Sequence, residues 1–323
     1  MYDTLKLILQ EEELNNEICF IEEVSCRITD MKFYNNRVVG RIKNMLVDIR
    51  GTTLIVEGSL TKWLLGNNYE KCLSLWEIRV AIESLSVALG VPMEMAKIVR
   101  LDIAFTFSVK YEPWLYLRRL LYLDNYYRSN IEKETLYFDK YDLQLVFYDK
   151  IKELNNNYNV EELEDIVHLY LIRNEFRFKK VTRTLGEVRG KCLYDPGFCL
   201  SLLDKWYKCY MSIDKQVDEV GVKLNGVKGL KESCVALCMS EMNLFERVEE
   251  SFCMKKIDSS VKFAILKELR RIGRLYLNNE EAPLIRELTD KVINAYMLLK
   301  RRYNIASARM EVFNKCIGSK YVV

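Results

Sequence analysis

The sequence predicts an α+β protein in which an antiparallel-sheet domain, residues 1–192, is followed by an all-helical C-terminal domain, residues 193–323. Two observations lead to this prediction. Segments with alternating apolar residues dominate the first part, with a few helical segments between them, which is typical of a mostly antiparallel sheet packed against helices. From about residue 195 onwards, apolar residues recur every three or four positions, which is typical of helices.

Most of the first sixty residues are expected to form strands, because β-branched residues alternate with polar ones there. The expected strands span residues 4–9, 17–28, 37–49 and 52–60, with breaks at residues 30–36 and at Arg50-Gly51. The segment 73–90 changes to helical spacing, and Gly90 ends the expected helix.

The middle of the chain is expected to continue as strand, helix, hairpin, helix and strand. These elements span residues 98–109, 112–123 with Pro113 in the first turn, 134–154 with a turn near residues 140–142, roughly 160–168, and 167–180. The C-terminal helices are expected within residues 197–211, 230–252, 258–277 and 283–304.

Composition and motifs argue against several classes of protein. The net charge of +3 is too small to indicate a nucleic-acid partner by itself. No phosphate-binding loop, dinucleotide-binding glycine motif or G-x-S-x-G motif is present. The single histidine, His168, cannot supply a histidine-based metal site, and we expect it to be packed rather than catalytic. The ten cysteines form no CxxC pair and the chain starts without a secretion signal, so we expect a reduced, cytoplasmic protein.

The first of three informative segments is RLDIAF, residues 100–105. Alternation places Leu101 and Ile103 on one sheet face and Arg100 and Asp102 on the other. An aspartate in mid-strand costs free energy to bury unless a cation or a hydrogen-bond donor compensates it. Asp102 is therefore either an ion-pair partner, for example of Arg100, or a ligand of a cation.

The second segment is IRNEFRFKK, residues 172–180. One face carries a basic row with a single carboxylate, formed by Arg173, Glu175, Arg177 and Lys179. This row is either the solvent-exposed face of an amphipathic strand or a phosphate-binding surface with one candidate metal ligand, Glu175. Together with Asp102, Glu175 would supply the oxygen ligands that Mg²⁺ or Mn²⁺ prefers.

The third segment is LVFYDK, residues 145–150, in which Tyr148 and Lys150 share a face and are expected to emerge together at the polar end of the strand. A tyrosine can attack a phosphodiester and retain the DNA end covalently if a cation lowers its pKa or a metal polarises the phosphate. Since the chain contains twenty tyrosines, these residues alone do not select Tyr148.

Taken in order, RLDIAF, TLYF…LVFYDKIKE and RNEFR resemble the replication initiators of the filamentous-phage gene II/X family. Staphylococcal plasmid initiators are similar in the same places, but more distantly. The segment GSLTKWLLGNN, residues 58–68, resembles a phage-and-plasmid II/X branch common in Bacteroidetes. The resemblance covers roughly residues 50–190, and the helical tail only in outline.

This resemblance implies a rolling-circle replication initiator, a site-specific nickase that cuts and rejoins one DNA strand at a phage or plasmid origin through a covalent phosphotyrosyl intermediate. It implies that the nucleophile is Tyr148, as in the phage branch, or Tyr137, as in the plasmid branch, with Lys150 beside it. It also implies that Asp102 and Glu175 bind Mg²⁺ or Mn²⁺.

The expected partner is origin DNA, single-stranded at the nick, in the cytoplasm of a bacterial host. Its phosphates would be bound by Arg100, Arg173, Arg177 and Lys179. A host helicase or polymerase is a further candidate partner. The protein is not expected to associate with a membrane. The alternative is a non-catalytic DNA-binding replication or regulatory protein with the same fold.

Overall fold

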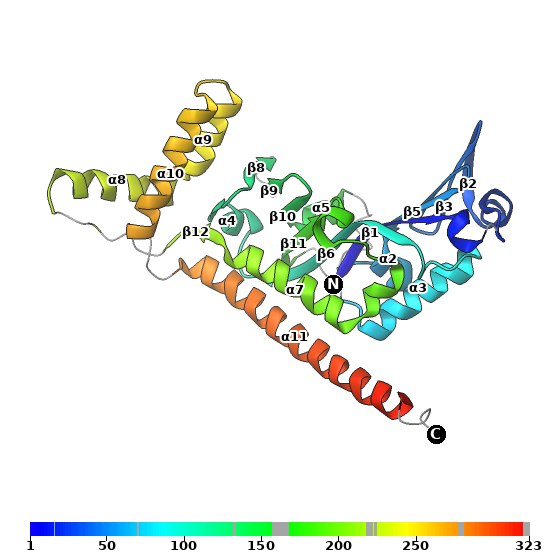
Figure 1. The fold of residues 1–323 in the computed structure, drawn as a ribbon. Coiled ribbons are helices and arrows are strands. Elements are labelled where there is room, and N and C mark those ends of the chain that lie inside the picture. The colour runs from blue at the N-terminus through cyan, green and yellow to red at the C-terminus, as the bar shows by residue number, and fades with distance from the viewer. Residues whose placement is uncertain are drawn as a thin grey trace.

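The computed structural model describes residues 1–15, 17–69, 71–131, 134–156, 168–217, 222, 225–276 and 281–318. A large antiparallel sheet occupies the N-terminal part of the chain and helices dominate the C-terminal part (Figure 1). The predicted α+β class is therefore confirmed.

The main sheet has ten strands, and each strand pairs with its neighbours in antiparallel fashion. Their spatial order is β2 (Thr29–Tyr34), β3 (Arg37–Ile42), β4 (Met45–Arg50), β5 (Thr53–Ser59), β1 (Tyr2–Gln10), β6 (Lys97–Val109), β11 (Tyr170–Phe178), β10 (Leu143–Asp149), β9 (Thr135–Lys140) and β8 (Tyr127–Ile131). The segments RLDIAF, IRNEFRFKK and LVFYDK thus lie on three adjacent strands, β6, β11 and β10.

Helices cover one face of this sheet. They are α3 (Leu75–Leu89), α7 (Pro196–Met211) and α11 (Pro283–Gly318) (Figure 1). The ring of Trp206 on α7 lies 4.1 Å from that of Phe105 on β6, and its indole N–H donates to Asn174 on β11. Buried residues of α7 and α11 belong to the same hydrophobic cluster as the sheet. These helices therefore close the apolar face and leave the polar face to the candidate site.

Shorter elements connect these parts. The remaining short helices are α1 (Phe20–Glu23), α2 (Leu60–Leu65), α4 (Pro113–Leu117), α5 (Lys150–Asn155) and α6 (Val181–Leu185), with 3-10 turns at Glu11–Leu14, Ser25–Arg27 and Gly190–Tyr194. A second, two-stranded sheet pairs β7 (Leu120–Leu123) with β12 (Ile213–Lys215).

Three further helices project beside the end of the sheet that carries β8 (Figure 1). They are α8 (Val227–Met242), α9 (Leu244–Cys253) and α10 (Ser259–Tyr276). A second hydrophobic cluster joins them to Leu121 and Tyr122 of β7. The division into domains at residues 192 and 193 stays a prediction, while the two clusters separate α8–α10 from α7 and α11.

The structure corrects several expectations for the first fifty residues. Residues 17–28 are not a strand, because Phe20 and Val24 are buried one helical turn apart and α1 forms there. Residues 30–34 lie in an edge strand, β2, whose side chains are all exposed and so show no apolar alternation. The expected strand at 37–49 is two strands, because Lys43 adopts a left-handed turn conformation (φ 50°) between them.

Other corrections concern the later elements. The expected helix at 112–123 ends at Leu117, and β7 follows because it pairs with β12. The expected helix at 230–252 is divided into α8 and α9 at Asn243, which has a φ of 47°. The strand β12 shows that the C-terminal part is not entirely helical. The helix expected at 160–168 lies almost entirely outside the described residues.

Candidate active site

The polar side chains of the three segments project from the same face of the sheet. In the register, Asp102 of β6 lies opposite Arg177 of β11, and Glu175 of β11 lies opposite Val146 of β10. Tyr148 lies opposite Arg173. Because directly paired residues point to the same side, the register brings together groups that alternation within each strand could not relate to one another.

Glu175 is the centre of this arrangement, and only 4% of it is exposed. Its Oε1 accepts hydrogen bonds from the hydroxyl of Tyr148 at 2.7 Å and from Nε of Arg173 at 3.1 Å. Its Oε2 accepts from Nε and Nη2 of Arg177 at 2.8 and 2.6 Å. Two guanidinium groups therefore compensate the burial of this carboxylate.

Asp102 is buried on the adjacent strand, where its Oδ2 accepts from Nη2 of Arg100 at 2.7 Å. Burial raises the pKa of Asp102 to about 6, and Arg100 and Arg177 oppose this rise only in part. Nε of Arg177 is 3.9 Å from the same Oδ2. The guanidinium of Arg177 therefore lies between the two carboxylates, Asp102 and Glu175, that were expected to bind a metal.

Asp3 is a third buried carboxylate of this face, and it is not among the site residues predicted from the sequence. Its Oδ2 is 2.9 Å from Nη2 of Arg173, and its Oδ1 accepts from the side-chain amide of Asn68 at 2.9 Å. Burial raises the pKa of Asp3, but the charge of Arg173 and the hydrogen bonds from Asn68, Ser59 and Arg173 together outweigh it and hold the pKa well below its usual value. A signal was present in the sequence, because Asp3, like Asp102, is a carboxylate within an apolar strand.

The segment 58–68 reaches this network through the loop after α2. Arg173 donates to the backbone carbonyl of Asn68 at 2.6 Å, and Ser59 donates to Asp3 at 2.9 Å. The segment GSLTKWLLGNN thus forms hydrogen bonds with the buried ion pair of Arg173 and Asp3.

Tyr137 and Tyr148 line the same pocket, which has a volume of about 350 Å³. Arg177 and Glu153 also contribute to its walls. Burial, followed by the charge of Glu175, raises the pKa of Tyr148 well above the usual value for a phenol. The hydroxyl of Tyr148 therefore keeps its proton until a base removes it, and Glu175 is the base within reach.

A basic groove of about 550 Å³ adjoins the tyrosine pocket. Its cationic lining residues are Lys6, Arg100, Arg177, Lys179, Lys180 and Arg183. Arg177 lines both the groove and the pocket, so the two cavities are adjacent. A negatively charged chain bound in the groove would therefore pass beside the pocket at Arg177.

Residues 1–186 match the family of phage replication-associated proteins of the gene II type, in its N-terminal domain. The chain belongs to this family. The matched region contains the lining residues of the tyrosine pocket and of the basic groove, and both candidate metal ligands. Membership supports a role as a phage-type replication initiator that acts on DNA. No curated protein matches the chain.

Not every residue expected at the site is where the sequence suggested. Arg100, Arg177 and Lys179 of the initiator line the basic groove, whereas Arg173 is 3% exposed. The burial of Arg173 favours an ion-pairing role over the predicted contact with phosphate. Lys150 does lie beside Tyr148, with its ammonium 5.9 Å from the centre of the tyrosine ring. It does not emerge at the surface as expected, because it begins α5, is buried and pairs with Glu153 at 2.5 Å.

His168 of the initiator is exposed just before β11, and the expectation that it is packed is wrong. The strand begins only at Tyr170, so His168 precedes the region whose side chains alternate into the core. Within the described ranges, no three His, Cys, Asp or Glu side chains form a metal-binding group, and no disulfide joins the nine cysteines whose side chains are described. None of the described helices has the length and apolar character needed to cross a membrane.

Proposed function

We propose that this initiator nicks and rejoins one strand of origin DNA, with Tyr148 as the nucleophile and Glu175 as its base. The observation that carries this proposal is the 2.7 Å hydrogen bond from the Tyr148 hydroxyl to Glu175, in a pocket that lies beside the basic groove. A purely DNA-binding protein would need the groove, but not a buried tyrosine–carboxylate pair beside it.

The reaction is a transfer of a phosphoryl group from one oxygen to another. The Tyr148 oxygen attacks the scissile phosphorus while its proton passes to Glu175, and the bond from phosphorus to the 3′ oxygen breaks. The 5′ phosphate remains on Tyr148, and the 3′ oxygen takes up a proton to become a free hydroxyl that can prime synthesis. The reverse reaction rejoins the strand.

Arg177 is placed to neutralise charge in this step. Its guanidinium contacts Glu175 at 2.6 Å and lies at the junction between the groove and the pocket. Positive charge close to a phosphoryl group stabilises the charge that develops in the transition state. Arg177 therefore neutralises charge at the scissile phosphate, while Arg100 and Lys179 bind the flanking phosphates.

The carboxylates also suit a divalent ion. Mg²⁺ is commonly held by one or two carboxylates together with waters and substrate phosphates, and Asp102 and Glu175 supply two oxygen donors on adjacent strands. The guanidinium of Arg177, 3.9 Å from Asp102, already places a positive charge between these donors. When bound, the ion would supply a Lewis acid that polarises the phosphate. Arg177 would then turn toward the groove, which its partial exposure permits.

Covalent capture tests the proposal. The full chain is incubated with 3′-labelled single-stranded DNA tiled across the replicon that encodes it, with Mg²⁺, with Mn²⁺ or with a chelator. We expect a denaturant-resistant adduct that requires the metal and disappears in the Tyr137→Phe/Tyr148→Phe double variant. Binding to DNA without any adduct would favour the alternative, a non-catalytic DNA-binding protein.

A second prediction separates function from stability at Asp102. Because burial raises its pKa to about 6, above the value of an unfolded aspartate, its contribution to stability decreases as the pH rises through this window. Asp102→Asn is therefore expected to stabilise the protein at pH 8, by about 1–3 kcal/mol. The same variant is expected to lose metal-dependent nicking by roughly 100-fold or more, because a metal ligand is lost.

Urea unfolding at pH 5 and pH 8 measures this effect. Asp48→Asn is the matched control, since hydrogen bonds from Arg37 and Arg50 overcome the effect of burial and lower the pKa of Asp48. The control is expected to lose stability at pH 8. If Asp102→Asn also lost stability there and kept full activity, Asp102 would be only an ion-pair partner of Arg100.

A further inference from the structure

The polar face of the sheet continues well beyond the candidate active site. Lys6 of β1 lies opposite Arg100 of β6 on one side and opposite Glu57 of β5 on the other. Glu57 lies opposite Leu46 of β4, which lies opposite Arg41 of β3. The register therefore carries one continuous face from the basic groove to the hairpin at the far edge of the sheet.

This outer part of the face is rich in exposed cations. We call it the basic ribbon, and it consists of Lys32, Arg37, Arg41 and Arg50 on β2, β3 and β4. The acidic residues of these three strands are Asp30, at the irregular start of β2, and the buried Asp48.

The charges of the basic ribbon are only partly neutralised. Asp48 accepts from both Arg37 and Arg50, at 2.7 and 2.6 Å. Among the described residues, no carboxylate pairs with Lys32 or Arg41. The ribbon therefore retains a net positive charge that is exposed to solvent.

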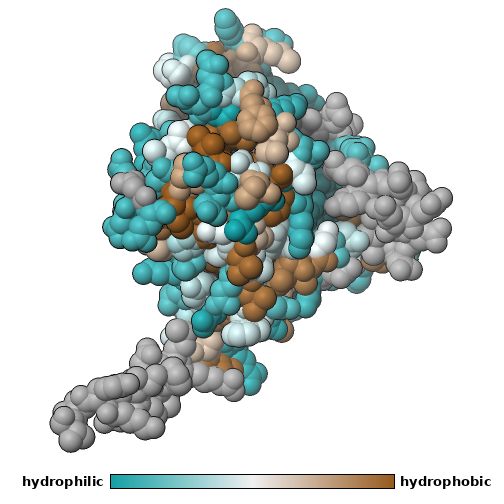
Figure 2. All heavy atoms as spheres, turned by 90° about the vertical axis from the view of Figure 1, so that its right-hand side faces the viewer, coloured by the Kyte–Doolittle hydropathy of each residue, from teal (hydrophilic) through white to brown (hydrophobic). Residues whose placement is uncertain are grey.

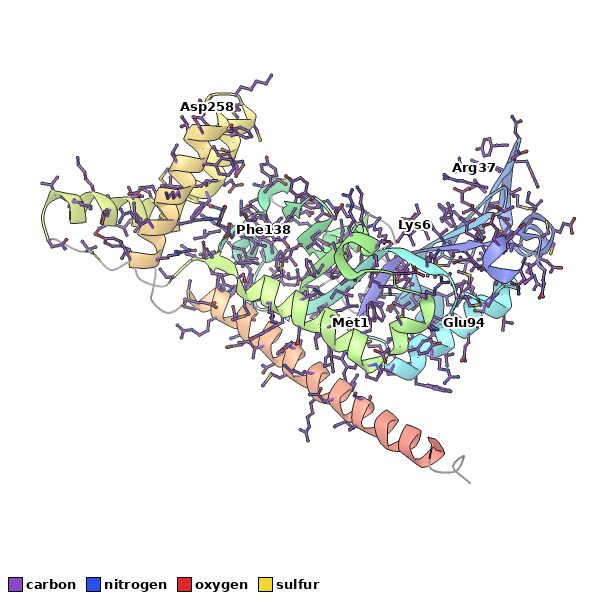
Figure 3. All side chains as sticks on the ribbon, in the orientation of Figure 1. Met1, Lys6, Arg37, Glu94, Phe138 and Asp258 are labelled. Carbon is purple, nitrogen blue, oxygen red and sulfur yellow. The ribbon has the colours of Figure 1, made fainter. Side chains whose placement is uncertain are left out.

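The opposite side of these strands is closed. Val38, Val47 and Ile49 are buried in the hydrophobic core, so only the polar face is accessible in the middle of the ribbon. In Figure 3, Lys6 and Arg37 both lie on the side of the sheet away from α7 and α11. The β2–β3 hairpin projects from the end of the sheet in Figure 1.

We propose that the basic ribbon binds double-stranded DNA flanking the nick, while the groove and the pocket hold the single strand that is cut. This inference rests on the proposed function for the identity of the bound strand. At about 4.8 Å per strand, the part of the path outside the groove, from β6 to β2, crosses five strand spacings, or roughly 24 Å. That length corresponds to about seven base pairs of B-form DNA, at about 3.4 Å per base pair.

The shape and side chains of the ribbon favour a duplex. Its outermost part is the β2–β3 hairpin. Such a pair of strands is narrow enough to enter the major groove of B-form DNA. Tyr34 is 54% exposed near the turn of the hairpin, on the same face as Arg37, and so adds an apolar surface beside a phosphate-binding cation. Hydrophobic groups are scattered among hydrophilic ones on this end of the molecule (Figure 2). This mixed surface suits a polar, wet interface with DNA.

Fluorescence anisotropy with DNA of graded duplex length tests the inference. The probes are mixed-sequence DNAs with a twelve-nucleotide single-stranded arm and stems of 6, 10, 14 or 18 base pairs, bound to the full chain in a chelator so that no cleavage occurs. We expect the affinity to rise about 10- to 100-fold between the shortest stem and 14 base pairs, since about three further phosphates are contacted.

Three variants identify the surface. The neutralised triple variant, Lys32→Gln/Arg37→Gln/Arg41→Gln, should lose the gain in affinity with stem length. Its slope of log affinity against log salt should be smaller in magnitude by about 2.7. The charge-conserving Lys32→Arg/Arg37→Lys/Arg41→Lys variant should keep the gain, as should a control on other elements, Arg79→Gln/Lys191→Gln/Lys267→Gln. All three must keep the circular dichroism spectrum of the parent chain.

Two outcomes would overturn the inference. One is a gain in affinity that persists in the neutralised variant, and the other is an equal gain on single-stranded probes of matched length. Neither outcome depends on nicking. A failure of the inference that the basic ribbon binds duplex DNA can therefore be distinguished from a failure of the proposed nicking activity.

Discussion

Tyr148→Phe is expected to reduce the rate of adduct formation by about 10⁴-fold or more, since removal of a catalytic nucleophile has effects of this size. Tyr137→Phe is expected to reduce it by less than about tenfold. The reason is the environment of the two hydroxyls. Tyr148 donates to Glu175 at 2.7 Å, whereas no carboxylate among the described residues accepts a hydrogen bond from Tyr137. Tyr137 lines the same pocket and would contact the DNA beside the scissile phosphate.

Single-turnover assays with the labelled DNA separate the two tyrosines. Tyr141→Phe is the control, because Tyr141 lies in the turn of the same hairpin and is 95% exposed. An adduct that survives in Tyr148→Phe and is lost in Tyr137→Phe would assign the nucleophile to Tyr137. Glu175→Gln should keep DNA binding and lose most of the adduct, since the amide cannot accept the phenolic proton.

The sequence predicted those strands that bury one face. Alternating apolar residues located β1, β5, β6, β10 and β11, and the five are close to their predicted positions. It did not locate β2, because an edge strand without a buried face has no apolar alternation to detect. The turn between β3 and β4 was missed for another reason, since neither Gly nor Pro marks the left-handed Lys43.

The site was predictable strand by strand, but not as a whole. Alternation put Asp102, Glu175 and Tyr148 on the polar sides of their strands, and the hairpin joined β9 to β10. The order β1-β6-β11-β10 depends on pairing between strands distant in sequence, which local patterns do not encode. For the same reason the burial of Arg173 could not be predicted, because Asp3 and Asn68 reach it from the N-terminal part of the chain.

Arg173→Met is expected to destabilise the folded protein by about 3–5 kcal/mol at neutral pH, because removing one partner of a buried ion pair leaves the others uncompensated. Arg173 lies 2.9 Å from Asp3 and 3.1 Å from Glu175, and both carboxylates are buried. Urea unfolding measures the loss. Arg177→Met is the matched control, and its cost is expected to be smaller, about 1–2 kcal/mol, since its side chain is 24% exposed and water can reach Glu175 in its place.

The pH dependence distinguishes lost charge from lost packing. In the parent chain Arg173 lowers the pKa of Asp3, so this carboxylate contributes stability above the pKa of an unfolded aspartate and the contribution is lost as the pH falls through the folded pKa. In Arg173→Met the buried Asp3 loses the charge that lowers its pKa, and its desolvation is opposed only by the hydrogen bonds from Asn68 and Ser59. Its pKa therefore rises, and protonation at lower pH removes part of the cost of burying the carboxylate. The deficit should therefore shrink between pH 7 and pH 4, and Asp3→Asn in the Arg173→Met background should recover part of it at pH 7. A deficit that is independent of pH would mean that Arg173 stabilises the sheet by packing its aliphatic stem.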